Sequence, residues 1–104
     1  MNFKLDKYHN NENTYVQVAG EIDAYTAPKL KEELLPLAEE PNPSLIISLK
    51  DVSYIDSTGL GVIIALYKQI TKKEGKLKLV DLSERLERLF DITGLNNVIT
   101  ISSN

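Results

Sequence analysis

The chain has 104 residues, enough for one compact domain with a modest core and too few for two. Its net charge of −3 and its 42% hydrophobic and 26% charged residues argue against a nucleic-acid-binding protein, which usually carries a basic excess. The sequence contains no cysteine, which excludes disulfides, thiolate metal sites and thiol nucleophiles.

The start of the chain predicts two strands joined by a polar hairpin turn. Phe3 and Leu5 alternate with polar residues, and the same period-two pattern recurs at residues 15–19, with Gly20 ending the second strand. The polar run between them begins with His9, the single histidine. We interpret this run as a turn rather than a metal site, because no second histidine exists to share a metal ion.

A helix and a central strand are predicted next. Thr26 and Pro28 indicate a helix start, because proline is tolerated in the first turn. Pro36 would remove a hydrogen bond inside the helix, so we expect a kink or an early end near Leu35. The nearly continuous apolar run at residues 45–49 predicts a central strand covered on both faces or nearly so.

The second half of the chain continues the alternation of helices and strands. A helix is predicted at residues 57–72, with Gly75 stopping it, and a strand at residues 77–80. Asp81, followed three residues later by a glutamate, resembles a capping box for a third helix.

The end of the chain completes the predicted fold. Gly94 is expected to cap the third helix at its carboxyl end, and residues 98–101 predict a short last strand. The expected order is therefore β-β-α-β-α-β-α-β, an α/β fold in one domain over residues 1–104.

This order predicts where the polar loop residues meet. Strands that alternate with helices are normally parallel, so the loops after the second, third and fourth strands should leave the same edge of the sheet. Those loops are residues 21–25, 51–58 and 81–83. Partners of open α/β sheets usually bind at this carboxyl edge, and we expect Asp23, Asp56 and Ser57 to be neighbours there.

The most informative segment joins an apolar strand to an apolar helix. It contains Asp56, Ser57, Thr58, Gly59 and Gly61. Aspartate and serine are strong N-cap residues, and a phosphate on an exposed hydroxyl there would face free N–H groups and the positive end of the helix dipole. The glycines leave the backbone uncovered, so another protein can approach it closely. The segment indicates a phosphorylation switch, with an ordinary helix cap as the competing interpretation.

Catalytic and cofactor alternatives have weaker support. A dinucleotide loop would need a third glycine where Ile64 stands, and the Gly-x-Ser-x-Gly sequence of hydrolases is absent. A Ser-His-Asp triad would have to recruit His9 from the first hairpin. Asp23 and Asp56 could pair for acid–base chemistry or Mg²⁺, although lone loop aspartates more often cap helices.

Three stretches of the sequence resemble a known family. Residues 20–28 (GEIDAYTAP) and 51–62 (DVSYIDSTGLGV) resemble the STAS-domain anti-sigma factor antagonists, or anti-anti-sigma factors. Residues 82–95 are similar to the general-stress (sigma-B) branch, the RsbV type. The resemblance covers essentially the full length, and the Asp-Ser-Thr-Gly-Leu-Gly segment is specific to the family.

The resemblance implies a single STAS domain with a mixed, mostly parallel sheet on which the helices pack. It also implies that Ser57 is the phosphoacceptor, with Thr58 as the second candidate. The unphosphorylated protein would bind an anti-sigma factor that is also a serine kinase and so release a sigma factor, and a PP2C-type phosphatase would restore that form. Asp56 is implied to orient the serine, and Asp23 to contact the kinase.

The same resemblance implies a partner-binding surface. Its residues are Asp23, Asp56, Ser57, Thr58, Gly59 and Gly61. It further implies a protein that is not an enzyme and that uses no cofactor or metal, and we expect the free protein to be a monomer.

Two other functions stay open at this point. One is a sensor module that binds a nucleotide or another small anion at the same edge, and the other is a hydrolase that uses Ser57. The chain lacks both the apolar stretch of a signal peptide and the ~20 successive apolar residues of a membrane-spanning helix. We therefore expect a cytoplasmic protein without direct membrane or nucleic-acid partners.

Overall fold

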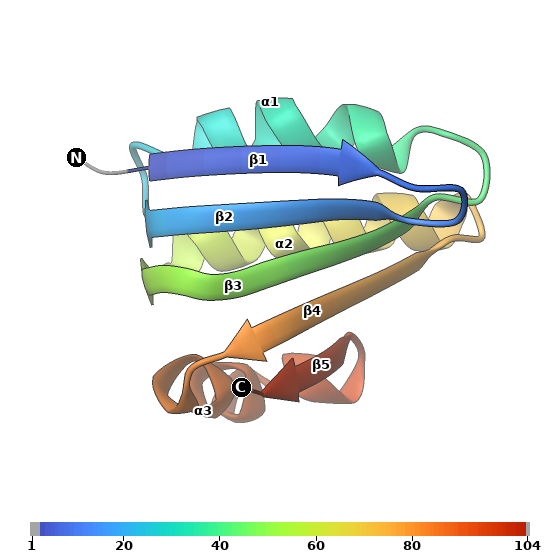
Figure 1. Cartoon of the computed structure of the whole chain (residues 1–104). Coiled ribbons are helices and arrows are strands. Elements are labelled where there is room, and N and C mark those ends of the chain that lie inside the picture. The colour runs from blue at the N-terminus through green and yellow to red at the C-terminus, as the bar shows by residue number, and fades with distance from the viewer. Residues whose placement is uncertain (1–2, 104) are drawn as a thin grey trace.

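The structure, a computed structural model, describes residues 3–103 (Figure 1). These residues form five strands and three α-helices in the order β-β-α-β-α-β-α-β, which confirms the predicted order and fold class. The strands are β1 (Phe3–His9), β2 (Thr14–Ile22), β3 (Ser44–Ile55), β4 (Lys76–Leu82) and β5 (Thr100–Ser103). The helices are α1 (Ala27–Ala38), α2 (Ser57–Lys72) and α3 (Glu84–Thr93), with the 3₁₀ turn η1 (Leu95–Asn97) before the last strand.

The five strands form one mixed sheet in the order β1-β2-β3-β4-β5. β1 is antiparallel to β2, and the other neighbouring pairs are parallel. The carboxyl ends of β2, β3 and β4 therefore meet at one edge, as predicted, and α1, α2 and α3 begin there (Figure 1).

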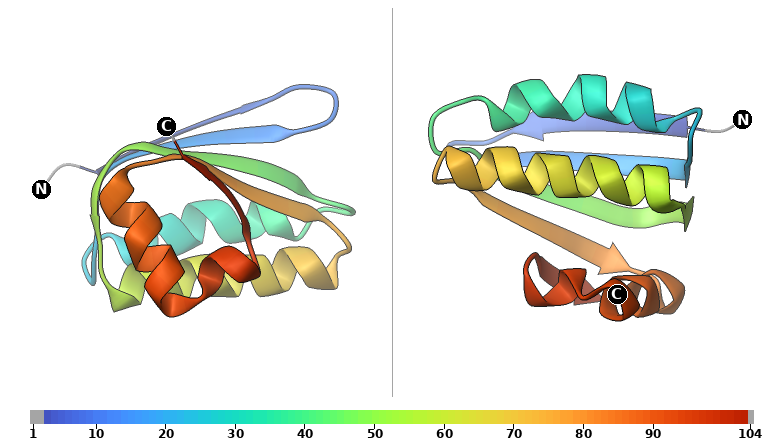
Figure 2. Two further views of the ribbon diagram at one scale, coloured as in Figure 1. Left: turned by 90° about the horizontal axis from the view of Figure 1, so that it is seen from below. Right: turned by 180° about the vertical axis from the view of Figure 1, so that it is seen from behind.

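All three helices lie on the same side of the sheet, and the opposite face is open (Figure 2). The strand order explains this arrangement. Each parallel strand is added next to the preceding one in the same direction, so every right-handed crossover places its helix on the same face.

The prediction that β3 is covered on both faces is therefore wrong. β3 is central in the sheet, but burial alternates along it: Leu45, Ile47 and Leu49 are buried in the core, whereas Ile46 and Ser48 are half-buried on the open face. An isoleucine on the open face makes the run look continuously apolar in sequence.

Strands β2 and β3 are longer than predicted. β2 passes through Gly20 (φ 105°) and ends at Ile22, and β3 passes through Asp51 and ends at Ile55. The pairing of these strands shifts register twice, including between Gly20 and Glu21. The bulges accommodate the positive φ angle of Gly20 without ending the strands. The predicted strand ends at Gly20 and before Asp51 are therefore wrong.

Of the two effects expected from Pro36, a kink or an early end, the early end of α1 near Leu35 is wrong. The helix continues through Pro36 to Ala38. Pro36 is exposed and lies in the last turn, where the missing N–H removes one hydrogen bond close to the end of the helix.

Helix α3 begins with a different cap from the one predicted. Asp81 belongs to β4, has φ 61°, and its carboxylate accepts the Ser48 hydroxyl at 3.0 Å. The N-cap is Ser83, whose Oγ accepts the Leu86 N–H at 3.2 Å. The carboxyl cap is Gly94 at φ 78°, as predicted.

Candidate functional site

The candidate site lies where β2 and β3 end and α1 and α2 begin. The Asp56 N–H donates to the carbonyl oxygen of Ile22 at 3.1 Å, which fixes the start of α2 to the end of β2. Asp23 follows Ile22 directly, so the turns that hold Asp23, Asp56 and Ser57 adjoin one another, as predicted.

Asp56 is the N-cap of α2. Its backbone is extended (φ −102°, ψ −174°), and its carboxylate Oδ1 accepts the Gly59 N–H at 3.0 Å. Its carbonyl oxygen accepts the Leu60 N–H, also at 3.0 Å. The half-buried carboxylate thus fixes the first turn of the helix and the position of the residues that follow it.

Ser57 and Thr58 are the first two residues of α2, and both are exposed. Neither hydroxyl makes a hydrogen bond within the described residues 3–103. Their backbone N–H groups have no acceptor in that part of the chain either, because the Asp56 carboxylate accepts the N–H of Gly59 instead. The Ser57 hydroxyl is therefore accessible and stands beside free N–H donors.

The two glycines of the segment have different roles. Gly59 is buried, and a Cβ there would lie 2.6 Å from Cγ2 and 3.0 Å from the carbonyl oxygen of Ile22. The interpretation that Gly59 leaves the backbone uncovered for a partner is wrong, because Ile22 already covers it. Gly61 is exposed, and a Cβ there would meet nothing within 4 Å, so its role at a partner surface stays a prediction.

A groove of about 440 Å³ between α1 and α2 opens beside the exposed glycine. Thr58, Gly61 and Val62 line it from α2, and Ala27, Pro28 and Lys31 line it from α1. Pro28 and Lys31 were not predicted as site residues from the sequence. They are separated from α2 in sequence, and only the packing of the two helices brings them to Thr58.

Asp23 holds the turn between β2 and α1. Its Oδ1 accepts the N–H groups of Tyr25 at 2.9 Å and Thr26 at 3.1 Å. The other carboxylate oxygen accepts no hydrogen bond from residues 3–103, so it is free to meet a partner. Asp23 thus stabilises the turn through one carboxylate oxygen, and the contact of its second oxygen with a kinase stays a prediction.

The catalytic alternatives fit the arrangement poorly. His9 pairs with Thr14 at the start of β2, so it lies at the opposite edge of the sheet from Ser57 and cannot form a triad with it. The Asp23 and Asp56 carboxylates both accept backbone N–H groups. Among residues 3–103, no three His, Cys, Asp or Glu side chains are grouped so as to hold a metal ion.

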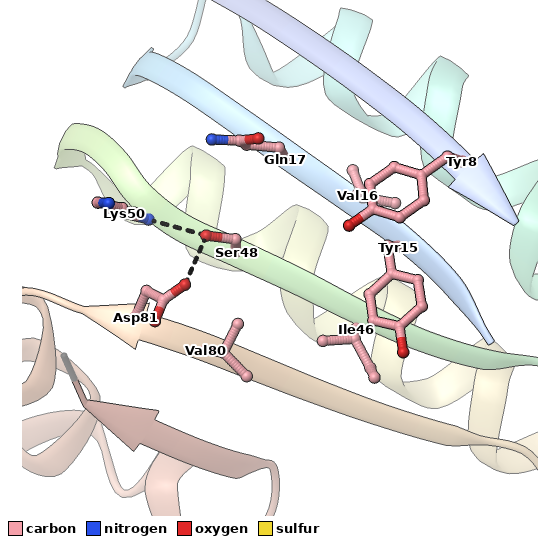
Figure 3. A pocket seen from close by; sticks show the side chains of 9 residues that line it. All are labelled: Tyr8, Tyr15, Val16, Gln17, Ile46, Ser48, Lys50, Val80 and Asp81. Carbon is pink, nitrogen blue, oxygen red and sulfur yellow. Dashed lines mark hydrogen bonds between the residues drawn. The ribbon is translucent and has the colours of Figure 1, made fainter. Parts of the chain in front are cut away.

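A separate shallow pocket of about 290 Å³ lies on the open face of the sheet (Figure 3). Tyr8 and Tyr15 stack there with ring centroids 5.1 Å apart, and Ser48 donates to Asp81. Because all the helices lie on the other side of the sheet, this pocket contains none of the predicted site residues.

Fold and site together define a class: a small α/β module that presents an exposed serine hydroxyl at a helix start on the carboxyl edge of its sheet. Residues 4–104 match the STAS domain family, and the chain belongs to that family. No helix within residues 3–103 is long and apolar enough to cross a membrane.

Similar sequences confirm the resemblance to the sigma-B branch. The chain is 55% identical over 103 residues to the anti-sigma-B factor antagonist of Bacillus subtilis (strain 168), with 99% of this chain and 94% of the relative covered. It is 45% identical over 104 residues to the protein of that name in Listeria monocytogenes, with 99% and 91% covered. These names describe regulatory proteins rather than enzymes.

Similar structures agree with the fold. The crystal structure of an anti-sigma factor antagonist from Mycobacterium paratuberculosis has a TM-score of 0.85 and 27% identity, covering 99% of this chain and 87% of its own. The anti-sigma factor antagonist SpoIIAA in its unphosphorylated form has a TM-score of 0.74 and 15% identity, covering 99% and 89%. The second similarity concerns the fold alone.

Proposed function

We propose that this protein is a cytoplasmic anti-sigma factor antagonist controlled by phosphorylation of Ser57. The unphosphorylated form binds an anti-sigma factor that is also a serine kinase, and the bound sigma factor is released. Phosphorylation of Ser57 blocks this binding, and a PP2C-type phosphatase reverses the block. The chain supplies the acceptor hydroxyl, while the kinase supplies ATP, Mg²⁺ and the catalytic groups.

The observation that carries this proposal is the 55% identity, over nearly the full length, to a protein named anti-sigma-B factor antagonist. The geometry of the site supports the choice of residue. Ser57 is exposed, and its hydroxyl has no hydrogen bond within residues 3–103. A kinase can therefore reach this hydroxyl without unfolding any part of the domain.

The start of α2 also favours the phosphorylated product. The N–H groups of Ser57 and Thr58 are free to donate, and the helix dipole favours a negative charge by ~0.3–1 kcal/mol at an exposed helix start. Phosphoserine carries about −1.5 to −2 charges at pH 7. The fold thus has no reason to change, and the switch operates because the partner surface rejects the added charge and bulk.

Incubation with the anti-sigma kinase of the same organism and ATP, followed by mass mapping of the product, tests the proposal. We expect one phosphate on Ser57 and none in Ser57→Ala, whereas Thr58→Ala should still carry its phosphate on Ser57. Phosphate on Ser48, Ser53 or Ser83 would contradict the proposal, and phosphate on Thr58 alone would move the switch by one residue.

A further inference from the structure

A second groove, of about 400 Å³, lies between the end of β3 and α3. We call it the α3 groove. Ile55 and Leu86, both buried, and the half-buried Leu89 form its apolar lining, and Tyr54 and Ile92 stand at its rim. Tyr54 is 47% exposed and Ile92 81% exposed. The groove thus offers apolar surface to solvent next to a partly buried apolar floor.

The charged groups of this groove are all of one sign. Arg85 and Arg88, the only arginines in the sequence, both line it and are both exposed. Arg88 lies 3.5 Å from Glu84 in an exposed pair, which is the weakly stabilising kind, and Arg85 has no ion pair within residues 3–103. The lining of the groove is therefore basic, while the carboxylates of α3 (Glu84, Glu87 and Asp91) do not line it.

Arginine has a particular chemistry at such a site. Its planar guanidinium donates two parallel hydrogen bonds to one carboxylate, which lysine cannot do. An apolar groove flanked by two such groups is complementary to a protein segment that carries carboxylates and at least one large apolar side chain.

The groove adjoins the proposed phosphorylation site along the chain. Ile55 belongs to its lining, and Asp56 and Ser57 follow it directly in the chain. A protein whose active site reaches the Ser57 hydroxyl approaches this end of the molecule, where Tyr54 and the start of α3 are among the neighbouring surfaces, as is the groove between α1 and α2.

We propose that the α3 groove docks an acidic segment of the anti-sigma factor, with an apolar side chain of that segment between Tyr54 and Ile92 and its carboxylates on Arg85 and Arg88. This inference rests on the proposed function and adds a second contact zone to it. The groove contributes affinity and orientation, whereas Ser57 decides whether the complex forms.

Calorimetric titration of the full-length anti-sigma factor into the unphosphorylated chain tests the proposal. The double variant Arg85→Ala/Arg88→Ala should weaken binding about 10- to 100-fold, the range for loss of buried arginine contacts. The matched control Lys68→Ala/Lys72→Ala removes two exposed charges from α2 and should change the affinity less than about twofold. Arg85→Lys/Arg88→Lys should recover only part of the lost affinity, because lysine restores the positive charge but not the two parallel hydrogen bonds of the guanidinium.

The outcomes separate the two proposals. Binding of the unphosphorylated chain to the anti-sigma factor, together with mass mapping that places the kinase's phosphate on Ser57, supports the proposed function whatever the arginine variants do. Unchanged affinity of the arginine double variant then overturns the α3 groove alone. A chain that binds no anti-sigma factor overturns both proposals.

Further measurements exclude other occupants. Ile92→Ala, at an exposed position, should weaken binding without lowering the urea midpoint. This variant tests the groove independently, so that a folding defect of the arginine variant would not explain both losses of affinity. If the arginine variant slowed only dephosphorylation by the phosphatase, or if Ile92→Ala dissolved a dimer of this chain in sedimentation experiments, the anti-sigma factor would not be the occupant.

Discussion

Helices α2 and α3 begin at the same edge of the sheet, each with a serine near its first residue, yet the two serines differ in their chemistry. Ser83 is itself the N-cap of α3, and its half-buried hydroxyl accepts the Leu86 N–H at 3.2 Å. Ser57 stands one position later in its helix, because Asp56 takes the cap position, and its hydroxyl is exposed and unbonded within residues 3–103.

The surrounding charges deepen this difference. The first turn of α3 contains Glu84 and Glu87, which would repel a phosphate on Ser83. The first turn of α2 contains no acidic residue. The N-cap Asp56 precedes Ser57, but its carboxylate already accepts the Gly59 N–H, and two N–H groups of the turn are free within the part of the chain that the structure describes. An offset of one residue relative to the cap thus separates a structural serine from one available for modification.

The largest expected effect concerns partner binding. Phosphate on Ser57 should weaken binding to the anti-sigma factor about a hundredfold, because an interface mismatch of even ~3 kcal/mol has that effect. Ser57→Ala should bind like the unaltered chain and become insensitive to ATP, whereas Ser83→Ala should stay sensitive. Calorimetry with and without prior incubation with the kinase and ATP measures both.

Amide NMR of the two forms supplies the control for this prediction. Shift changes should cluster around Ser57 and the neighbouring loops. Changes spread through residues 45–49 and 77–80 would show that the sheet itself responds, so that the switch would be conformational.

The next effect separates the two glycines of α2. Gly59→Ala should lower the free energy of unfolding by about 1–3 kcal/mol, because its Cβ would lie 2.6 Å from Ile22 Cγ2. Gly61→Ala should raise it by roughly 0.8–1 kcal/mol through helix propensity, since the new methyl meets nothing within 4 Å. Urea denaturation measures both, and equal effects would mean that Ile22 does not constrain the start of α2.

Asp23 extends the comparison to α1, the third helix that begins at this edge. Asp23→Ala should cost about 1–3 kcal/mol, because two N–H groups lose a charged acceptor. Asp23→Asn keeps an acceptor oxygen and should retain most of the stability. If the asparagine variant also binds the anti-sigma factor normally, the carboxylate is a turn residue only and its proposed contact with the kinase is wrong.

The smallest effects compare the two serines directly. Ser83→Ala should cost about 0.5–2 kcal/mol, the usual range for a lost N-cap. Ser57→Ala should stay within about 0.5 kcal/mol, as for exposed residues without special contacts. A larger loss for Ser57→Ala in urea denaturation would show that its hydroxyl supports the helix after all.

The sequence predicted the order of the elements and the place of Asp56 and Ser57 correctly, because both depend on short-range features. Period-two and helical spacing of apolar residues, a proline near a helix start and Gly94 at a helix end are read within one or two turns of chain. Bulges are harder to predict, since the register of two strands fixes them, and this is why β2 and β3 run past their predicted ends.

Tertiary structure alone decided which surfaces are free. The steady addition of strands in one direction put every helix on one face and left Ile46 on the other, although its neighbours in sequence are buried. The packing of α2 against β2 buried Gly59 under Ile22, and the packing of α3 beside β3 brought Arg85 towards Tyr54. These contacts join residues far apart in the chain, so they follow from strand order and crossover handedness, which no local pattern of residues encodes by itself.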